Sequence, residues 1–143
     1  MAGSSTVNAT VKMVNSLQLI GYSDSKHAIV IDTSTEAGGF EMGNKPMELV
    51  LIALGGCTAM DVISIMKKKR EKLTGLEIKI SGERFEEHPK VYKNISLHYV
   101  FKGENLSDEA IERSISLSQE KYCSVSAMLK KAADVKVTWE KSP

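Results

Sequence analysis

The chain has 143 residues and a mass of 15.7 kDa, which suits one domain with a core of its own, and we expect a single domain over residues 1–143. Its 19 basic and 18 acidic residues nearly cancel and aromatic residues are sparse, so neither nucleic-acid binding nor attraction to an anionic membrane is indicated. The start of the chain lacks a basic segment followed by an apolar one, so no secretory signal is predicted and a cytoplasmic location is expected.

The first third of the chain predicts a three-stranded meander. Apolar and polar residues alternate over residues 6–14, and strand-like segments follow at residues 17–22 and 27–32. Short polar segments at residues 15–16 and 23–25 suit the turns between these strands. Residues 33–45 contain three glycines and predict a loop that leads into the next element.

A long apolar helix is predicted from Pro46 to Arg70. Pro46 suits the first turn of a helix, and Glu48 places a negative charge near the positive end of the helix dipole. Basic residues at 67–70 place positive charge at the other end. Between residues 49 and 66, the side chains with hydrogen-bonding groups are Cys57, Thr58, Asp61 and Ser64. A helix that is apolar nearly all round is buried on all sides or lies in a membrane.

Burial in a soluble protein is the favoured interpretation of this helix. Its apolar run is shorter than the roughly 20 residues of a membrane span, and it contains Gly55, Gly56 and Asp61. Two adjacent glycines suggest that another backbone or a ligand approaches closely there, although they also suit plain tight packing. Because one small sheet cannot cover so many apolar faces, we expect a second subunit to cover the rest, as an obligate homodimer.

The second half of the chain predicts a hairpin, two helices and a last strand. Alternation predicts strands over residues 76–86 and 92–101, with the central helix ending at Thr74-Gly75. Ser107 suits the N-cap of an amphipathic helix that runs to about Tyr122. Residues 127–133 predict a short helix capped by Ser124 or Ser126, and residues 134–140 predict the final strand. The order βββ-α-ββ-αα-β places the chain in the α+β class.

Cys57 and Cys123 are the two cysteines of the chain, and they carry its candidate chemistry. Two cysteines in a cytoplasmic protein are more often plain thiols or a redox pair than a static disulfide. A zinc site would need further ligands, and none of the histidines at 27, 88 and 98 stands at ligand spacing to a cysteine, so no metal or other cofactor is expected. If the two sulfurs meet, one can attack an oxidant and form a sulfenic acid, and the other can close a disulfide.

Two sequence motifs extend this interpretation. PMEL at residues 46–49 followed by LGGCTAMDV at residues 54–62 resembles the first cysteine motif of the OsmC/Ohr family. YCSVSA at residues 122–127 resembles its second motif, with Ser124 where the family usually has proline. The resemblance implies an intertwined α+β homodimer, in which long buried central helices that carry the cysteines are wrapped by antiparallel sheets.

Members of this family are thiol peroxidases that reduce hydroperoxides, often organic ones, without metal or haem, in defence against oxidative stress. By resemblance, Cys57 is the peroxidatic thiol, Cys123 is the resolving thiol, and a dithiol reductant restores both. Glu48 is the candidate for the catalytic glutamate, although it is offset by one position from the family's usual glutamate, where Met47 stands.

The chain also departs from the family pattern, and this keeps alternatives open. It has no arginine before Arg70, whereas well-characterised members use one from the N-terminal half. The cation could be a lysine at position 12, 26 or 45, but lysine lacks the guanidinium fork. The departure motivates a non-catalytic protein that binds a small hydrophobic ligand as the alternative. A thiol hydrolase ranks last, because no histidine stands in a recognisable partner position.

Asp61 lies one helical turn beyond Cys57, so the two side chains are expected to share a face. A carboxylate there would raise the pKa of a neighbouring thiol and oppose its reactivity. We therefore expect Asp61 to pair with a basic group or to cap the backbone of a partner.

Overall fold

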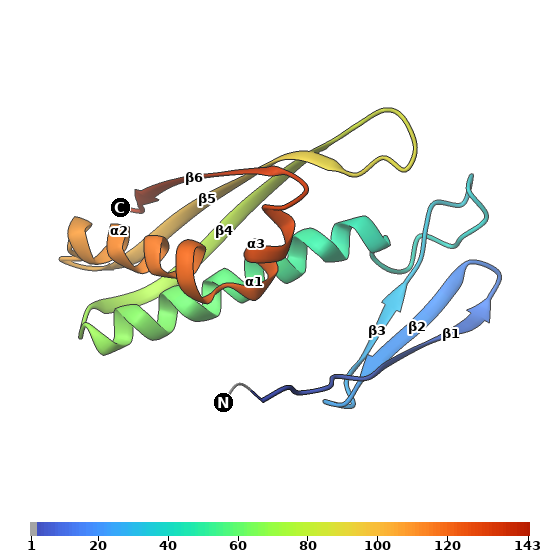
Figure 1. The fold of residues 1–143 in the computed structure, drawn as a ribbon, viewed down its shortest axis with the longest axis horizontal. Coiled ribbons are helices and arrows are strands. Elements are labelled where there is room, and N and C mark those ends of the chain that lie inside the picture. The colour runs from blue at the N-terminus through green and yellow to red at the C-terminus, as the bar shows by residue number, and fades with distance from the viewer. Residues whose placement is uncertain (1–2) are drawn as a thin grey trace. The chain divides into compact units, whose positions relative to one another are not determined.

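A computed structural model describes residues 3–143 and shows an α+β fold (Figure 1). The chain divides into two compact parts, one up to Val50 and one from Leu51 onward, which are described separately. The elements in chain order are β1 (Ala9–Asn15), β2 (Gln18–Ser23), β3 (Ala28–Ile31), α1 (Pro46–Lys68), β4 (Lys72–Arg84), β5 (Tyr92–Glu104), α2 (Asp108–Leu117), the π-helix η1 (Ser118–Tyr122), α3 (Ser124–Leu129) and β6 (Asp134–Lys141).

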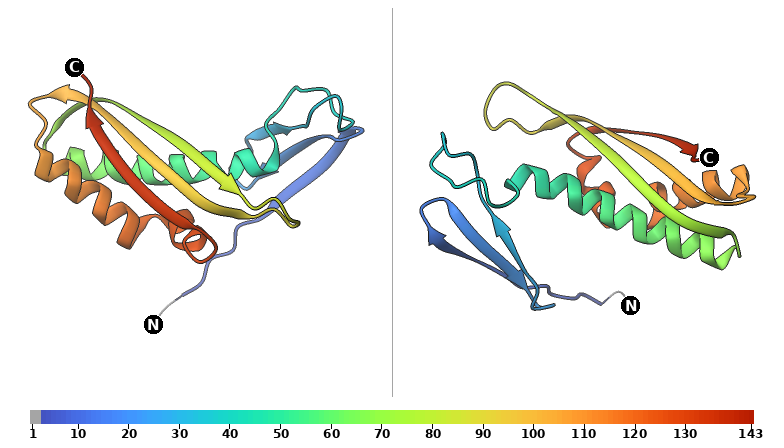
Figure 2. Two further views of the ribbon diagram at one scale, coloured as in Figure 1. Left: turned by 90° about the horizontal axis from the view of Figure 1, so that it is seen from above. Right: turned by 180° about the vertical axis from the view of Figure 1, so that it is seen from behind.

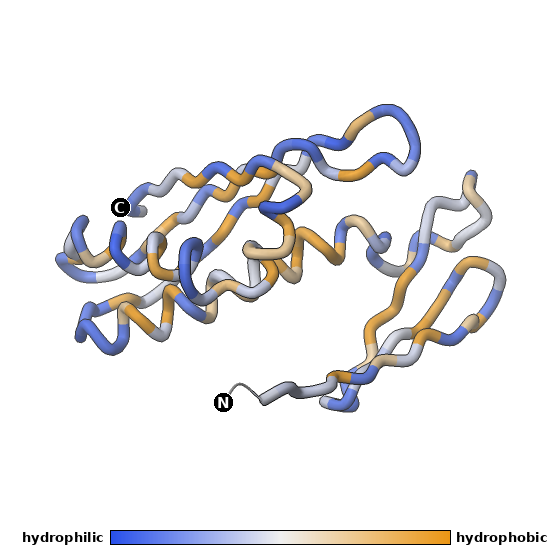
Figure 3. Tube along the Cα trace, viewed as in Figure 1, coloured by the Kyte–Doolittle hydropathy of each residue, from blue (hydrophilic) through white to orange (hydrophobic). Residues whose placement is uncertain are grey.

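The first part contains the predicted three-stranded meander. β1 pairs antiparallel with β2, and β2 pairs antiparallel with β3, so this prediction is confirmed. The meander buries little of its apolar surface by itself: Val11 is 59% exposed and Met13 is 75% exposed. Figure 3 shows apolar residues along β2 and β3 as well. The meander therefore has apolar surface that residues 3–50 do not cover.

Asp32 organises the loop between β3 and α1. Its buried carboxylate accepts hydrogen bonds from the backbone N–H groups of Thr33 at 2.7 Å, Phe40 at 3.1 Å and Met42 at 3.2 Å. The side-chain amide of Gln18 donates a further bond at 3.4 Å. Burial alone would raise the pKa of this carboxyl group, but these four donors together hold its pKa below the ordinary value of 3.8. The ionised carboxylate thus fixes a loop that has little regular structure.

We expect Asp32→Asn to destabilise the protein at neutral pH, because an amide nitrogen cannot accept these backbone donors. Since the folded-state pKa is lowered, the contribution of Asp32 is present above pH 3.8 and is lost as the pH falls through the folded-state pKa. Thermal unfolding followed against pH tests this: the gap between wild type and variant should narrow below pH 3.8. Glu36→Gln, an exposed change in the same loop, is the matched control and should leave the unfolding temperature unchanged. A gap that stays constant into strong acid would contradict the assignment.

In the second part, one face of the sheet β4-β5-β6 is covered by helices (Figures 1 and 2). β4 and β5 form the predicted antiparallel hairpin, but β6 pairs parallel with β5. The expectation of wholly antiparallel sheets is therefore wrong for this sheet. The reason is the crossover of α2, η1 and α3 between β5 and β6, since parallel neighbours need such a long connection.

The end of α1 differs from the prediction. Thr74 and Gly75 do not end the helix; they lie inside β4, next to an irregularity in its pairing with β5. The chain leaves α1 through Arg70, which adopts a left-handed conformation with φ 59°. Arg70 N–H bonds to the carbonyl of Lys67, and the next N–H bonds to the carbonyl of Met66. This is the Schellman pattern, here closed by an arginine instead of the expected glycine.

The core of the second part is made by matching faces of α1, β5 and α2. Alternate residues of β5 point into it, and α1 contributes residues four apart, as one buried stripe of a helix requires. The buried residues on these faces are Leu54, Thr58, Val62 and Met66 of α1, Ile95, Leu97, Tyr99 and Phe101 of β5, and Ala110, Ile111, Ser114 and Ile115 of α2. A Cβ at Gly55 would overlap Ile80 Cδ1 of β4, so a side chain, and not the backbone or ligand that the sequence predicted, packs closely against this glycine; a Cβ at Gly56 would have nothing within 4 Å.

Several apolar residues of α1 stay exposed among residues 3–143. Ile52 is 53% exposed, Met60 is 76% exposed and Ile63 is 47% exposed, all on a helix predicted to be buried on every side. By length and composition alone, α1 could also cross a membrane. Its buried stripe against β5, however, makes it the core helix of this fold. The sequence predicted that one chain could not cover this helix, and a second subunit as the cover of the remaining faces stays a prediction.

Candidate functional site

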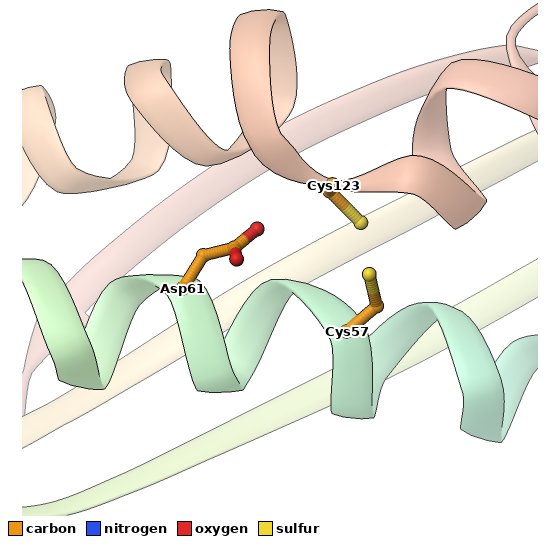
Figure 4. A group of neighbouring side chains, drawn as sticks. All are labelled: Cys57, Asp61 and Cys123. Carbon is orange, nitrogen blue, oxygen red and sulfur yellow. The ribbon is translucent and has the colours of Figure 1, made fainter. Parts of the chain in front are cut away.

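The two cysteine sulfurs meet, although 66 positions separate them in the sequence. Cys57 lies in the middle of α1 and is half-buried, and Cys123 directly precedes α3 and is 3% exposed. Figure 4 shows their sulfurs pointing toward each other, with the carboxylate of Asp61 on the same side of α1. The two sulfurs and a carboxylate oxygen of Asp61 all lie within 4.8 Å of one another. Both thiols are free.

The π-helix η1 places Cys123 in this position. The N–H of Cys123 bonds to the carbonyl of Ser118 at 2.7 Å, five residues earlier, which widens the last turn before the cysteine. The chain then turns extended at Cys123, which serves as the N-cap of α3. Ser126 N–H donates to Cys123 Sγ at 3.4 Å, so the prediction of Ser124 or Ser126 as the cap is wrong. A backbone N–H of α3 therefore points at the sulfur of Cys123.

The surroundings of Cys123 keep it protonated. Burial raises its pKa, and the hydrogen bond with Cys57 and the charges of Cys57 and Asp61 raise it further. The Ser126 N–H opposes these effects, but the pKa of Cys123 still rises to about 11. At neutral pH, Cys123 is therefore a thiol.

A directed chain of hydroxyl groups ends at Asp61. Ser118 Oγ donates its one proton to Asp61 Oδ2 at 2.9 Å, so it can only accept a hydrogen bond from Thr58. Thr58 Oγ1 lies 2.7 Å from Ser118 Oγ and therefore donates to it, and Tyr99 Oη, at 2.7 Å from Thr58 Oγ1, donates in turn to Thr58. Each hydroxyl has one proton, so the bond from Ser118 to Asp61 sets the direction of the whole chain.

Gln119 fixes the buried end of this chain. Its Nε2 donates to Thr58 Oγ1 and to Tyr99 Oη, both at 3.2 Å. Its Oε1 accepts from Ser126 Oγ at 2.7 Å, which ties the network to α3 beside Cys123. Burial raises the pKa of Tyr99, its hydrogen bonds with Thr58 and Gln119 lower it, and the charges of Cys123 and Asp61 raise it again, for a net increase. Tyr99 thus remains a neutral donor.

We expect Thr58→Val to destabilise the protein by about 1–3 kcal/mol, because it removes the hydroxyl that connects Tyr99 with Ser118 and leaves buried polar groups without a partner. Thr58→Ser keeps the hydroxyl and loses only a methyl group, so it is the matched control. Urea unfolding of the two variants measures the difference. Equal losses would mean that methyl packing, and not the hydroxyl chain, gives Thr58 its role.

Within one chain, Asp61 bonds to a serine and not to the basic group predicted, and a bond to the backbone of a partner stays a prediction. Asp61 shares a face with Cys57 as expected, but its carboxylate is held by a serine and forms no ion pair among residues 3–143. The spacing of four residues between Cys57 and Asp61 was the sequence signal that predicted their shared face. What the sequence could not show is that η1 brings Ser118 to the same point.

Glu48 is not part of this group of three side chains. It is exposed in the first turn of α1, where its Oε1 accepts the backbone N–H of Lys45 at 2.7 Å. This contact satisfies a donor at the helix N-terminus, as in a capping box. A catalytic role for Glu48 stays a prediction. Of the lysines considered as the missing cation, Lys12 lies over the ring of Tyr22, with Nζ 5.7 Å from the ring centre.

Comparison with known proteins gives a consistent result. The sequence profile of a family described as OsmC-like protein matches residues 38–138. Protein YhfA of Escherichia coli K12 is 41% identical over 134 residues, which is 94% of this chain and 97% of that protein. A hypothetical protein of Aquifex aeolicus VF5 has a solved structure with 33% identity and a TM-score of 0.86, over 97% of this chain and 98% of that one.

More distant structures share the fold. An organic hydroperoxide resistance protein OsmC from Legionella pneumophila superposes with a TM-score of 0.72 at 15% identity, over 97% of this chain and 99% of that one. At this identity, the likeness speaks for the fold alone. The profile match and the 41% identical relative extend over the two cysteine-bearing segments as well. The chain belongs to the OsmC-like protein family.

Proposed function

We propose that the protein is a cysteine-based peroxidase that reduces organic hydroperoxides in defence against oxidative stress. The observation that carries the proposal is the meeting of the two thiols, which face each other inside the fold without a disulfide. Proteins of the same fold include some named for organic hydroperoxide resistance, which is consistent with this proposal.

Cys57 is the side chain that attacks the peroxide. It is half-buried, whereas Cys123 is 3% exposed, so a substrate reaches Cys57 first. Cys57 gives up its thiol proton and its sulfur attacks the OH-bearing oxygen of ROOH; the O–O bond breaks, the leaving RO⁻ takes up one proton and departs as the alcohol ROH, and Cys57 becomes a sulfenic acid. The apolar side chains of α1 suit the alkyl part of such a substrate better than they suit hydrogen peroxide.

Cys123 then resolves the oxidised state. Its thiol attacks the sulfenic sulfur of Cys57, and the sulfenic oxygen leaves as water with the thiol proton. The product is a Cys57–Cys123 disulfide. A dithiol reductant restores both thiols by exchange and becomes a disulfide itself. With a pKa of about 11, Cys123 is protonated at neutral pH and does not compete with Cys57 for the peroxide, so Cys57 reacts first.

The proposed active form is a homodimer in the cytoplasm, with residues 1–143 of each chain as one domain. The exposed apolar residues on α1 and on the meander, such as Met60 and Met13, support a second copy of the chain as the cover of these surfaces. The family resemblance supports the same assembly. Glu48 is included in the proposal as the orienting carboxylate.

The test is oxidation of the reduced wild-type protein by one equivalent of cumene hydroperoxide, with intact mass read before and after. We expect the mass to fall by two hydrogen atoms within seconds and to recover on treatment with a dithiol. Non-reducing peptide mapping should find Cys57 linked to Cys123. Thiols that stay reduced over many minutes would contradict the proposal and favour the ligand-binding alternative.

A further inference from the structure

We propose that reduced Cys57, Cys123 and Asp61 form a binding site for a thiophilic divalent cation such as Zn²⁺. The three ligand atoms lie within 4.8 Å of one another. In a tetrahedral zinc site with Zn–S bonds of about 2.3 Å, ligand atoms lie about 3.6–3.8 Å apart. A small inward movement of side chains that already point together is therefore enough (Figure 4).

The second sphere of such a site is already built. Ligating carboxylates in metal sites are usually hydrogen-bonded in turn, and Ser118 Oγ donates to Asp61 Oδ2 at 2.9 Å. A carboxylate has several lone pairs, so this bond leaves Asp61 able to bind a cation as well. Cys123 Sγ accepts the N–H of Ser126, which offsets part of the negative charge of a bound thiolate. Both supporting groups are 0% exposed and belong to the hydroxyl and amide network around Thr58.

The ligand set defines the class of ion. Two sulfurs and one oxygen favour zinc, cadmium or another soft ion over Mg²⁺ or Ca²⁺, which prefer oxygen ligands. Three protein ligands leave the fourth tetrahedral position to water. The sequence pointed away from a metal because no histidine stands at ligand spacing to a cysteine. The third ligand is instead the carboxylate one turn along α1 from Cys57.

Metal binding and oxidation of the thiols exclude each other. Binding replaces two thiol protons, so two protons are released as the cation enters. Oxidation by a hydroperoxide reverses this: the two bound thiolates give up two electrons and form a disulfide, and ROOH with two protons becomes ROH and water. The cation leaves because a disulfide is no thiolate ligand. The site would thus hold a cation only in the reduced protein.

The inference does not rest on the proposed peroxidase activity, because binding needs only the two reduced thiols and the carboxylate. The two ideas fail separately. A protein that binds Cd²⁺ but does not react with peroxide supports the metal site and contradicts the peroxidase. A protein that reduces peroxide but shows no thiolate–metal absorption supports the peroxidase and contradicts the metal site.

The experiment is a titration of the reduced, tag-free chain with Cd²⁺, followed by the ultraviolet charge-transfer absorption of sulfur–cadmium bonds, with Zn²⁺ as competitor. We expect one Cd²⁺ per chain, an intensity equal to two thiolates, and displacement by Zn²⁺. Cys57→Ser and Cys123→Ser should each halve the intensity. Prior oxidation to the disulfide should abolish it, and peroxide added to the loaded protein should release the ion.

Asp61→Asn tests the carboxylate ligand, with Asp134→Asn, an exposed change at the start of β6, as the matched control. We expect Asp61→Asn to weaken Cd²⁺ binding about 10–100-fold and the control to bind as wild type does. Equal binding by Asp61→Asn and wild type would overturn the three-ligand site. So would the absence of charge-transfer absorption in wild-type protein whose two thiols are shown to be reduced.

Discussion

Cys57→Ser is expected to abolish turnover of cumene hydroperoxide, leaving only the background rate of the buffer. The serine hydroxyl is far less acidic than a thiol, so no comparable nucleophile stands at this point of α1. The variant should also form no disulfide and keep a free Cys123 after peroxide treatment. Peroxide consumption with a dithiol reductant, followed together with intact mass, measures both effects.

Cys123→Ser is the matched variant, since it removes the other sulfur of the same pair. It should lose recycling but still react once, so that Cys57 gains a single oxygen atom that a sulfenic-acid reagent can trap. Because Thr58 and Gln119 are unchanged, the buried network is expected to persist, which circular dichroism can check. If both variants turn over peroxide as wild type does, the assignment of the two cysteines is wrong.

Much of the fold follows from periodicity alone. Apolar and polar residues alternate clearly in the meander and in the β4–β5 hairpin. Ser107 is the N-cap of α2, as predicted, so the start of that helix could be read from the sequence. The ends and directions of some elements could not be predicted from the sequence. α1 ends at an arginine in a left-handed conformation, a choice that local sequence rules assign to glycine or asparagine. β6 could not be assigned a direction, because its pairing depends on the path of the crossover in space.

The candidate site also has features that the sequence predicted and features that it did not. The two cysteines and the shared face of Cys57 and Asp61 could be read from residue types and spacing. The π-helix could not, because a single widened turn leaves no clear sequence pattern, and η1 is what places Ser118 against Asp61. The hydroxyl chain through Thr58 and Tyr99 also stayed hidden, since residues on three separate elements meet in it.

Met60→Glu is expected to convert a dimeric wild type into a monomer or a poorly folded chain. Met60 is 76% exposed on a helix with no charged residue between Glu48 and Asp61, and in the proposed dimer a second subunit removes this surface from water. A carboxylate buried there without a cation would cost several kcal/mol, which is enough to separate a typical dimer. Sedimentation velocity at micromolar concentration measures the assembly.

Val137→Glu is the matched control, because it makes the same kind of change at an exposed apolar position of β6, where Val137 is 42% exposed. It should leave the dimer intact if α1 forms the interface. A well-folded wild-type monomer would contradict the dimer outright and leave the apolar face of α1 unexplained. Dissociation by Met60→Glu alone would instead identify α1 as the shared element, so that the two cysteine pairs of a dimer would be carried by helices that bury each other.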